Sequence, residues 1–175
     1  MENDTLDELE PYFDELGHDP EKEETKIKEL HELFCQDFVD NPFQVNGVTV
    51  AIKNEFSDHK GQPIYFGEFY HDFVHTITRR SDITKLRCFE PSRANRVHWI
   101  KPILLNCNDN RIKKYQFIEN KGKVRDYFWY EAKRFIVILE MILPDYWLVS
   151  AHVVDKDDRK HKDRYEKYIN AKKKT

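Results

Sequence analysis

Residues 134–155, RFIVILEMILPDYWLVSAHVVD, constrain the fold more than any other stretch of the chain. Two largely apolar arms flank the tripeptide Leu143-Pro144-Asp145. Proline fixes its own φ and aspartate hydrogen-bonds nearby backbone, so this tripeptide is typical of a tight turn. The stretch therefore predicts an antiparallel β-hairpin. Because a lone hairpin is marginally stable in water, we expect further strands or a helix to cover it.

The second arm of this hairpin predicts two different faces, because side chains along a strand alternate with a period of two. One face is expected to carry Trp147, Val149, Ala151 and Val153, and the other Tyr146, Leu148, Ser150 and His152. Two polar groups, Ser150 and His152, would then stand about 7 Å apart on the side opposite Ala151. We interpret that side as a working surface.

The charge distribution divides the 175 residues into an acidic arm and a basic body. Residues 1–40 hold 15 acidic and 3 basic side chains, a net charge of −12, whereas residues 41–175 carry +9. A basic body can hold a polyanion by displacing its counterions. The other interpretation is that both blocks are solvated faces with no partner.

Three features of the sequence indicate the cellular setting: the length of its apolar runs, the composition of its N-terminus and the spacing of its cysteines. No apolar run is long enough to span a bilayer, and the acidic start lacks the basic and apolar regions of a signal peptide. Cys35, Cys88 and Cys107 are widely spaced, which argues against a disulfide framework or a cysteine zinc site. These features predict a cytoplasmic protein with no membrane partner.

The remaining pattern predicts an α+β fold, in which a small antiparallel sheet of about four strands packs with helices behind an acidic helical N-terminal arm. We expect helices at 5–17, 20–39, 67–78, from 89 up to Pro102, and 156–174; strands at 43–53 around Asn46-Gly47, 103–105, 114–118, 124–132 and 134–155; and polar turns at 79–90. The arm at 1–40 has three possible roles, as a dimerisation element, a packed part of the domain, or a detachable cover over a nucleic-acid site.

His71, Asp72 and His75 form the first candidate site. Two histidines four apart on a helix project near one another, and HDFVH differs by one residue from the zinc-binding H-E-x-x-H pattern. Aspartate is one methylene shorter than the glutamate base, and no third ligand is recognisable downstream. The alternative is that His71 lies on the surface and only His75 points inward.

Arg93 and Arg96 form the second candidate site, with His98 and Trp99 beside them. Two guanidiniums one helical turn apart suit a phosphate, because each presents a planar fork of donors. The alternative is a solvated helix face. Ser150 and His152 form a third candidate site, in which an imidazole can accept or donate a proton near neutral pH.

The closing helix supplies a fourth candidate, in which positive charge and aromatic surface alternate. Arg159, Lys160, Arg164 and Tyr165 suit contact with an RNA backbone and its bases, although a solvated face is the simpler explanation of this helix taken alone.

Four of these pieces together resemble the phage-associated branch of the barnase–EndoU–colicin–RelE-like (BECR) nucleases. The matching segments are Phe69 to His75, Arg93-Arg96-Trp99, Tyr127 to Val154, and Arg159 to Tyr165. The last strand of that family often reads T-A-Y, where this chain has Ser150-Ala151-His152. The resemblance implies a helix-plus-sheet nuclease domain at 41–175 and metal-independent cleavage of RNA, either tRNA or mRNA at the ribosome.

The resemblance also implies a mechanism, in which the RNA 2′-hydroxyl attacks the adjacent phosphate and leaves a 2′,3′-cyclic phosphate. His75 would act as base or acid with His152 as its partner, and Arg93 and Arg96 would hold the phosphate oxygens. Ser150 would hydrogen-bond the phosphate. The side chains expected to bind substrate are His98, Trp99, Arg159, Arg164 and Tyr165.

We expect no metal or other cofactor, and we expect a cognate inhibitor protein among the partners. A competing function is a non-catalytic RNA- or protein-binding module of a mobile element, and a zinc hydrolase using His71 and His75 is a further alternative.

Overall fold

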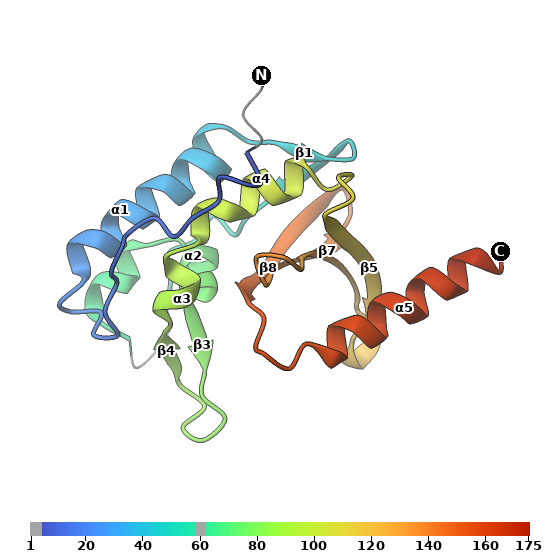
Figure 1. Cartoon of the computed structure of the whole chain (residues 1–175). Helices are drawn as coiled ribbons and strands as arrows, with labels where there is room; N and C mark the ends of the chain where they lie inside the picture. The colour runs from blue at the N-terminus through green and yellow to red at the C-terminus, as the bar shows by residue number, and fades with distance from the viewer. Residues whose placement is uncertain (1–4, 59–61) are drawn as a thin grey trace.

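A curled six-stranded sheet forms the centre of the computed structural model, which describes residues 5–58 and 62–175 (Figure 1). The strands of this sheet, in order across it, are β1 (Gln44–Val45), β2 (Val48–Ala51), β8 (Asp145–Val153), β7 (Phe135–Ile142), β6 (Val124–Tyr130) and β5 (Ile112–Ile118). A separate two-stranded ribbon consists of β3 (Thr78–Arg80) and β4 (Arg87–Phe89). The α+β class is confirmed, but the expected sheet of about four antiparallel strands was too small.

The additional strands come from the hairpin at Asn46-Gly47. Both residues have positive φ, 50° and 82°, as a tight hairpin turn between β1 and β2 requires. The second of these strands pairs with β8 in parallel, with Val50 opposite Tyr146. The large sheet is therefore mixed, because a parallel pair is added to an antiparallel meander of β5, β6, β7 and β8.

The β7–β8 hairpin lies where the sequence predicts it, but its strand faces differ from strict alternation. Ile138 pairs with Ser150 and Leu139 pairs with Leu148, so Val149 is the extra residue of a β-bulge. Tyr146 and Leu148 consequently pack with Ala151 in the main core, whereas Val149 packs on the opposite side. The predicted face assignment was wrong for Tyr146, Trp147, Leu148 and Val149, and correct for Ser150 and His152, which lie opposite Ala151.

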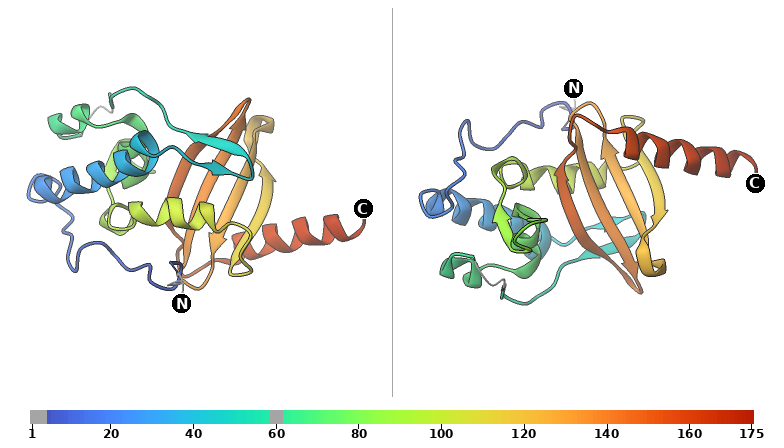
Figure 2. Two further views of the ribbon diagram at one scale, coloured as in Figure 1. Left: turned by 90° about the horizontal axis from the view of Figure 1, so that it is seen from above. Right: turned by 90° about the horizontal axis from the view of Figure 1, so that it is seen from below.

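The helices are α1 (Glu24–Cys35), α2 (His71–Ile77), α3 (Pro91–Ala94), α4 (Ile100–Leu105) and α5 (Arg159–Lys173). One face of the sheet packs against α1, α2 and α4, with Ile27, Leu30 and Phe73 wholly buried there. Figure 2 shows α4 and the β1–β2 hairpin crossing this side in its left panel. We call this side the core face. None of the described helices is both long and apolar enough to cross a membrane.

Several local predictions were wrong. The single helix expected from 89 up to Pro102 is divided into α3, a 3₁₀ turn at Val97–Trp99 and α4. Residues 103–105 belong to helix α4 rather than a strand, because Pro102 lies in its first turn, where a missing N–H does no harm. Residues 79–90, expected as turns, contain the β3–β4 ribbon. Helix α2 begins four residues later than expected, after a 3₁₀ turn at Ile64–Glu68.

The segment 5–17 is not the predicted helix, although α1 and the π-helical turn Gln36–Asp40 match the helix predicted at 20–39. Pro11 interrupts the segment, and Asn95 replaces the missing helical bonds. The amide of Phe13 donates to Asn95 Oδ1 at 2.7 Å, and Asn95 Nδ2 donates to the Phe13 carbonyl at 2.8 Å. Irregular backbone that forms hydrogen bonds to another element explains why the apolar spacing did not predict the structure of this segment.

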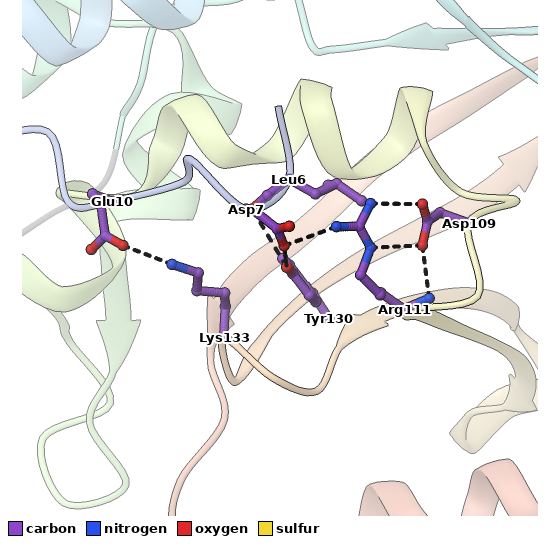
Figure 3. A network of polar contacts seen from close by, with 7 residues as sticks. All are labelled: Leu6, Asp7, Glu10, Asp109, Arg111, Tyr130 and Lys133. Carbon is purple, nitrogen blue, oxygen red and sulfur yellow. Dashed lines mark hydrogen bonds and ion pairs between the residues drawn. The ribbon is translucent and has the colours of Figure 1, made fainter. Parts of the chain in front are cut away.

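The same N-terminal segment is tied to the far end of the sheet (Figure 3). Asp7 pairs with Arg111 at 2.8 Å, Glu10 pairs with Lys133 at 2.7 Å, and Leu6 is wholly buried. Of the three roles considered for the arm, packing into the domain agrees with these contacts. The described part of the arm shares the core of the body through Leu6 of this segment and through the buried side of α1.

Candidate active site on the uncovered face

The face of the sheet opposite the core carries a second, smaller apolar cluster and a group of polar side chains. Its apolar residues are Tyr115, Tyr127, Trp129, Ile136, Ile138 and Val154. Helix α5 packs against β5 through Tyr165 and Tyr168, and in the right panel of Figure 2 none of the described helices crosses β7 or β8 on this side. We call this side the uncovered face.

Ser150 and His152 lie on β8 within this face. The Ser150 hydroxyl is 3.3 Å from Nδ1 of His152, and both residues are half-buried. Burial lowers the pKa of His152 to about 3, and the positive charge of Arg93 adds to the effect. The His152 ring is therefore neutral at pH 7, and it becomes an effective base when an anion bound beside it raises that pKa.

Three of the described cations lie within electrostatic range of the His152 ring, and they are Arg79 of β3, Arg93 of α3 and Lys160 of α5. His161 of α5 is also within that range. The uncovered face thus combines a neutral proton acceptor with converging positive charge, which suits an anion that must lose a proton during reaction.

Arg93 is held in place by backbone rather than by a carboxylate. Its Nη1 donates to the Thr78 carbonyl at 3.2 Å, and burial lowers its pKa to about 10, so it stays charged at neutral pH. Arg87 donates to the same carbonyl at 3.2 Å and to the His75 carbonyl at 2.9 Å. Two guanidiniums are therefore fixed at the C-terminal end of α2, next to β8.

His71 and His75 line a pocket of about 220 Å³ toward the turn end of the same face, together with Glu140, Trp147 and Val149. Their rings stack with centroids 6.0 Å apart. Asp72 is buried and accepts a hydrogen bond from the Lys53 amide at 2.7 Å, so it ties α2 to the end of β2. Within residues 5–58 and 62–175, no group of three or more histidine, cysteine or acidic side chains converges as a metal-ligand set.

The predicted arginine pair is divided between two surfaces. Helix α3 is a single turn, and Arg96 follows it with φ −128°, ψ 13°, so three-residue spacing does not place it beside Arg93. Arg96 donates to the Ser92 carbonyl at 2.8 Å and lies 5.2 Å over the Trp99 ring, near Glu10. It belongs to the contact between α3 and the N-terminal segment.

His98 and Trp99 lie in that same contact. Trp99 is 2 % exposed and donates to the Glu10 carbonyl at 2.9 Å, so it offers no free ring face to a base. His98 Nε2 is 3.0 Å from the same carbonyl. Both side chains anchor residues 5–17 rather than facing β8.

The α5 residues have separate environments. Arg159 is exposed and pairs with Asp157 at 2.7 Å. The Arg164 guanidinium carbon lies 3.3 Å from the centroid of the Phe117 ring, and Arg164 pairs with Glu119 at 3.6 Å, so it holds α5 to β5. Tyr165 packs on the smaller apolar cluster with Lys113 over its ring.

His161 is a side chain that the sequence reasoning missed. Its Nδ1 is 2.6 Å from the Tyr115 hydroxyl, and its ring lies 5.8 Å from that of Trp129. Burial and the charge of Lys160 lower its pKa. Arg79 and Arg87 were missed as well, because residues 79–90 were interpreted as turns; the Arg79-Arg80 pair was the available signal.

Comparisons of the chain with protein-family models, with curated proteins and with solved structures found no match. The uncovered face brings together His152, Ser150 and Arg93, with His161 on one side and His75 toward the turn end. Arg96 is not part of this group of side chains.

Proposed function

We propose that the protein is a metal-independent endoribonuclease whose active site is the uncovered face of the sheet between α2–α3 and α5. One observation carries the proposal: a neutral His152, hydrogen-bonded to Ser150, lies in the field of a fixed and charged Arg93. A base next to a preorganised cation is what attack of a ribose 2′-hydroxyl on its own phosphate requires. The resemblance to BECR nucleases agrees with this assignment.

In the proposed reaction, His152 accepts the proton of the 2′-hydroxyl as O2′ bonds to phosphorus. Arg93 stabilises the charge that develops on the non-bridging oxygens, and the Ser150 hydroxyl donates a hydrogen bond to one of them. The bond from phosphorus to O5′ breaks, and a protonated His75 donates its proton to the leaving oxygen. The products are a 2′,3′-cyclic phosphate and a 5′-hydroxyl.

Two basic elements flank the proposed site and would bind the RNA backbone. The β3–β4 ribbon projects from the body with Arg79, Arg80 and Lys85 exposed, and α5 presents Arg159 and Lys160 on the other side (Figure 1). Lysine and arginine hold nucleic acid largely by neutralising phosphates. We propose RNA as the partner, either tRNA or ribosome-associated mRNA, in a cytoplasmic setting where an inhibitor protein would control the activity.

Incubation of the purified chain with a mixed RNA pool in EDTA tests the proposal. Wild-type protein should cut RNA and leave 2′,3′-cyclic phosphate ends, and His152→Gln should slow cleavage by about 100-fold or more. His18→Gln, at an exposed histidine of the N-terminal segment, is the matched control and should cut at the wild-type rate.

Other outcomes separate the competing functions. A shift in RNA mobility without cutting would support a non-catalytic binding module. Cutting that stops in EDTA and returns with zinc would support a hydrolase using His71 and His75.

A further inference from the structure

A second cavity, separate from the proposed active site, lies between the loop after α4, strand β5 and the second half of α5. It has a volume of about 550 Å³, and we call it the α5 pocket. Its wall includes Asn46, Asn108, Asp126, Tyr146, Tyr165 and Tyr168. Neither His152 nor Arg93 is part of that wall. Figure 1 shows α5 passing β5 on the way to the C-terminus.

The aromatic part of the wall suits a flat ring. Tyr146, Tyr165 and Tyr168 are each half-buried, so their rings border the cavity without filling it. Lysine ammonium groups lie over two of them, Lys113 at 5.3 Å from the Tyr165 centroid and Lys172 at 4.7 Å from that of Tyr168. Tyrosine rings of this kind stack on nucleobases of any sequence.

The polar part of the wall offers donors and acceptors from several elements. Asn108 accepts from Lys114 Nζ at 2.7 Å and donates to Asn46 Oδ1 at 3.3 Å. Asp126 accepts from Gln116 Nε2 at 2.9 Å, and burial together with Asp126 raises the pKa of Tyr146. A small number of convergent polar groups on an aromatic wall is the usual composition of a small-molecule site.

We propose that the α5 pocket binds a nucleotide, with its base against Tyr165 and Tyr168 and its phosphate near Lys114 and Lys172. The amide of Asn108 and the carboxylate of Asp126 hydrogen-bond the edge of the base. The nucleotide is either a free mononucleotide or one residue of an RNA chain. This site stands on its own cavity and does not depend on the proposed cleavage reaction.

Calorimetric titration of the full chain tests the site, with AMP, GMP, CMP and UMP as one set of ligands and a single-stranded hexaribonucleotide as the other. At least one ligand should bind saturably, and Asn108→Ala and Tyr168→Leu should each weaken that binding by about tenfold. Binding of a mononucleotide indicates a free nucleotide as the ligand, and binding of the hexamer alone indicates an RNA residue.

Two lysines of the same helix give the matched control. Lys172→Ala, at the pocket, should weaken binding, whereas Lys167→Ala, which lines a different hollow on α5, should not. Melting temperatures near that of the wild type confirm that the variants fold. Absence of binding by all five ligands, or binding unchanged by both Asn108→Ala and Tyr168→Leu, would overturn the proposal.

Discussion

The two faces of the sheet each hold a half-buried histidine, and the two rings differ in their surroundings. On the core face, His31 lies among Phe69, Tyr70 and Phe73, and burial lowers its pKa to about 4. On the uncovered face, burial lowers the pKa of His152 as well, but this ring contacts a serine and lies among cations. Burial alone therefore does not mark a functional histidine; the polar and charged neighbours do.

The faces also differ in how much of the fold depends on them. Aromatic and aliphatic side chains from α1, α2 and α4 fill the core face, whereas α5 is the one described helix whose apolar side chains pack on the other side, toward β5. We infer that the core face determines stability and that the uncovered face is left free for chemistry. Substitutions on the two faces should therefore have different consequences.

Truncation of a core-face side chain should have the greatest consequence. Phe73 is wholly buried, so Phe73→Ala should lower the free energy of unfolding by about 3–5 kcal/mol through lost burial and a cavity. Ser150→Ala, on the other face, should cost less than about 1 kcal/mol. Urea denaturation of both variants measures the difference, and equal losses would contradict the division between the faces.

The second-largest expected effect is on the rate of RNA cleavage, and it should distinguish the two arginines that the sequence predicted as a pair. Arg93→Gln should slow RNA cleavage by about 100-fold, or about 2.7 kcal/mol, because it removes the cation next to His152. Arg96→Gln should leave the cleavage rate within a few-fold of wild type, because Arg96 lies near Glu10. Cleavage rates measured with saturating RNA distinguish the two variants. An equal reduction of the rate in both would support the predicted Arg93–Arg96 pair instead.

Acid should destabilise the protein through both buried histidines. Burial lowers their pKa from the ordinary value of 6.5 to about 4 for His31 and about 3 for His152, so the unfolded chain binds more protons as pH falls below 6.5. Each should cost roughly 2 kcal/mol of stability at pH 5 relative to pH 7.5.

Urea denaturation at the two pH values measures this cost. His31→Gln and His152→Gln should each remove part of the acid sensitivity. A pH dependence that neither substitution changes would show that the two rings are not held neutral by the fold.

The smallest expected effect is on RNA binding by the β3–β4 ribbon beside the proposed active site. Arg79→Ala should weaken RNA binding a few-fold and lower the salt slope of log K by about 0.7, as loss of one phosphate contact would do. Lys22→Ala, an exposed lysine of the N-terminal region, is the control and should change neither quantity. Filter binding at several salt concentrations measures both the affinity and the salt slope. Identical slopes for Arg79→Ala and wild type would show that the ribbon does not contact the RNA backbone through Arg79.

Local signals predicted much of the fold. The Pro144-Asp145 turn and the Asn46-Gly47 turn both join strands as expected, because turn chemistry is encoded in adjacent residues. The size of the sheet was not predictable in this way, since Val50 pairs in parallel with Tyr146, almost a hundred residues away. Long-range pairing leaves no periodic signal in the chain.

The candidate site was predicted less completely for similar reasons. Three-residue spacing placed Arg96 beside Arg93, but the helix ends at Ala94. Alternation placed Ser150 and His152 on one face correctly, while the bulge at Val149, which has no sequence signature, moved Leu148 to the other. His161 joins the site only through the packing of α5 on β5.

Cleavage of a 2′-modified substrate decides whether the uncovered face cuts RNA through the ribose 2′-hydroxyl. An RNA oligonucleotide that the protein cuts and its fully 2′-O-methylated counterpart would both be incubated with wild-type protein in EDTA. We expect the unmodified strand to be cut to 2′,3′-cyclic phosphate ends and the methylated strand to stay intact, because its 2′-oxygens cannot attack. Cutting of the methylated strand, or failure to cut any RNA, would contradict the proposed reaction.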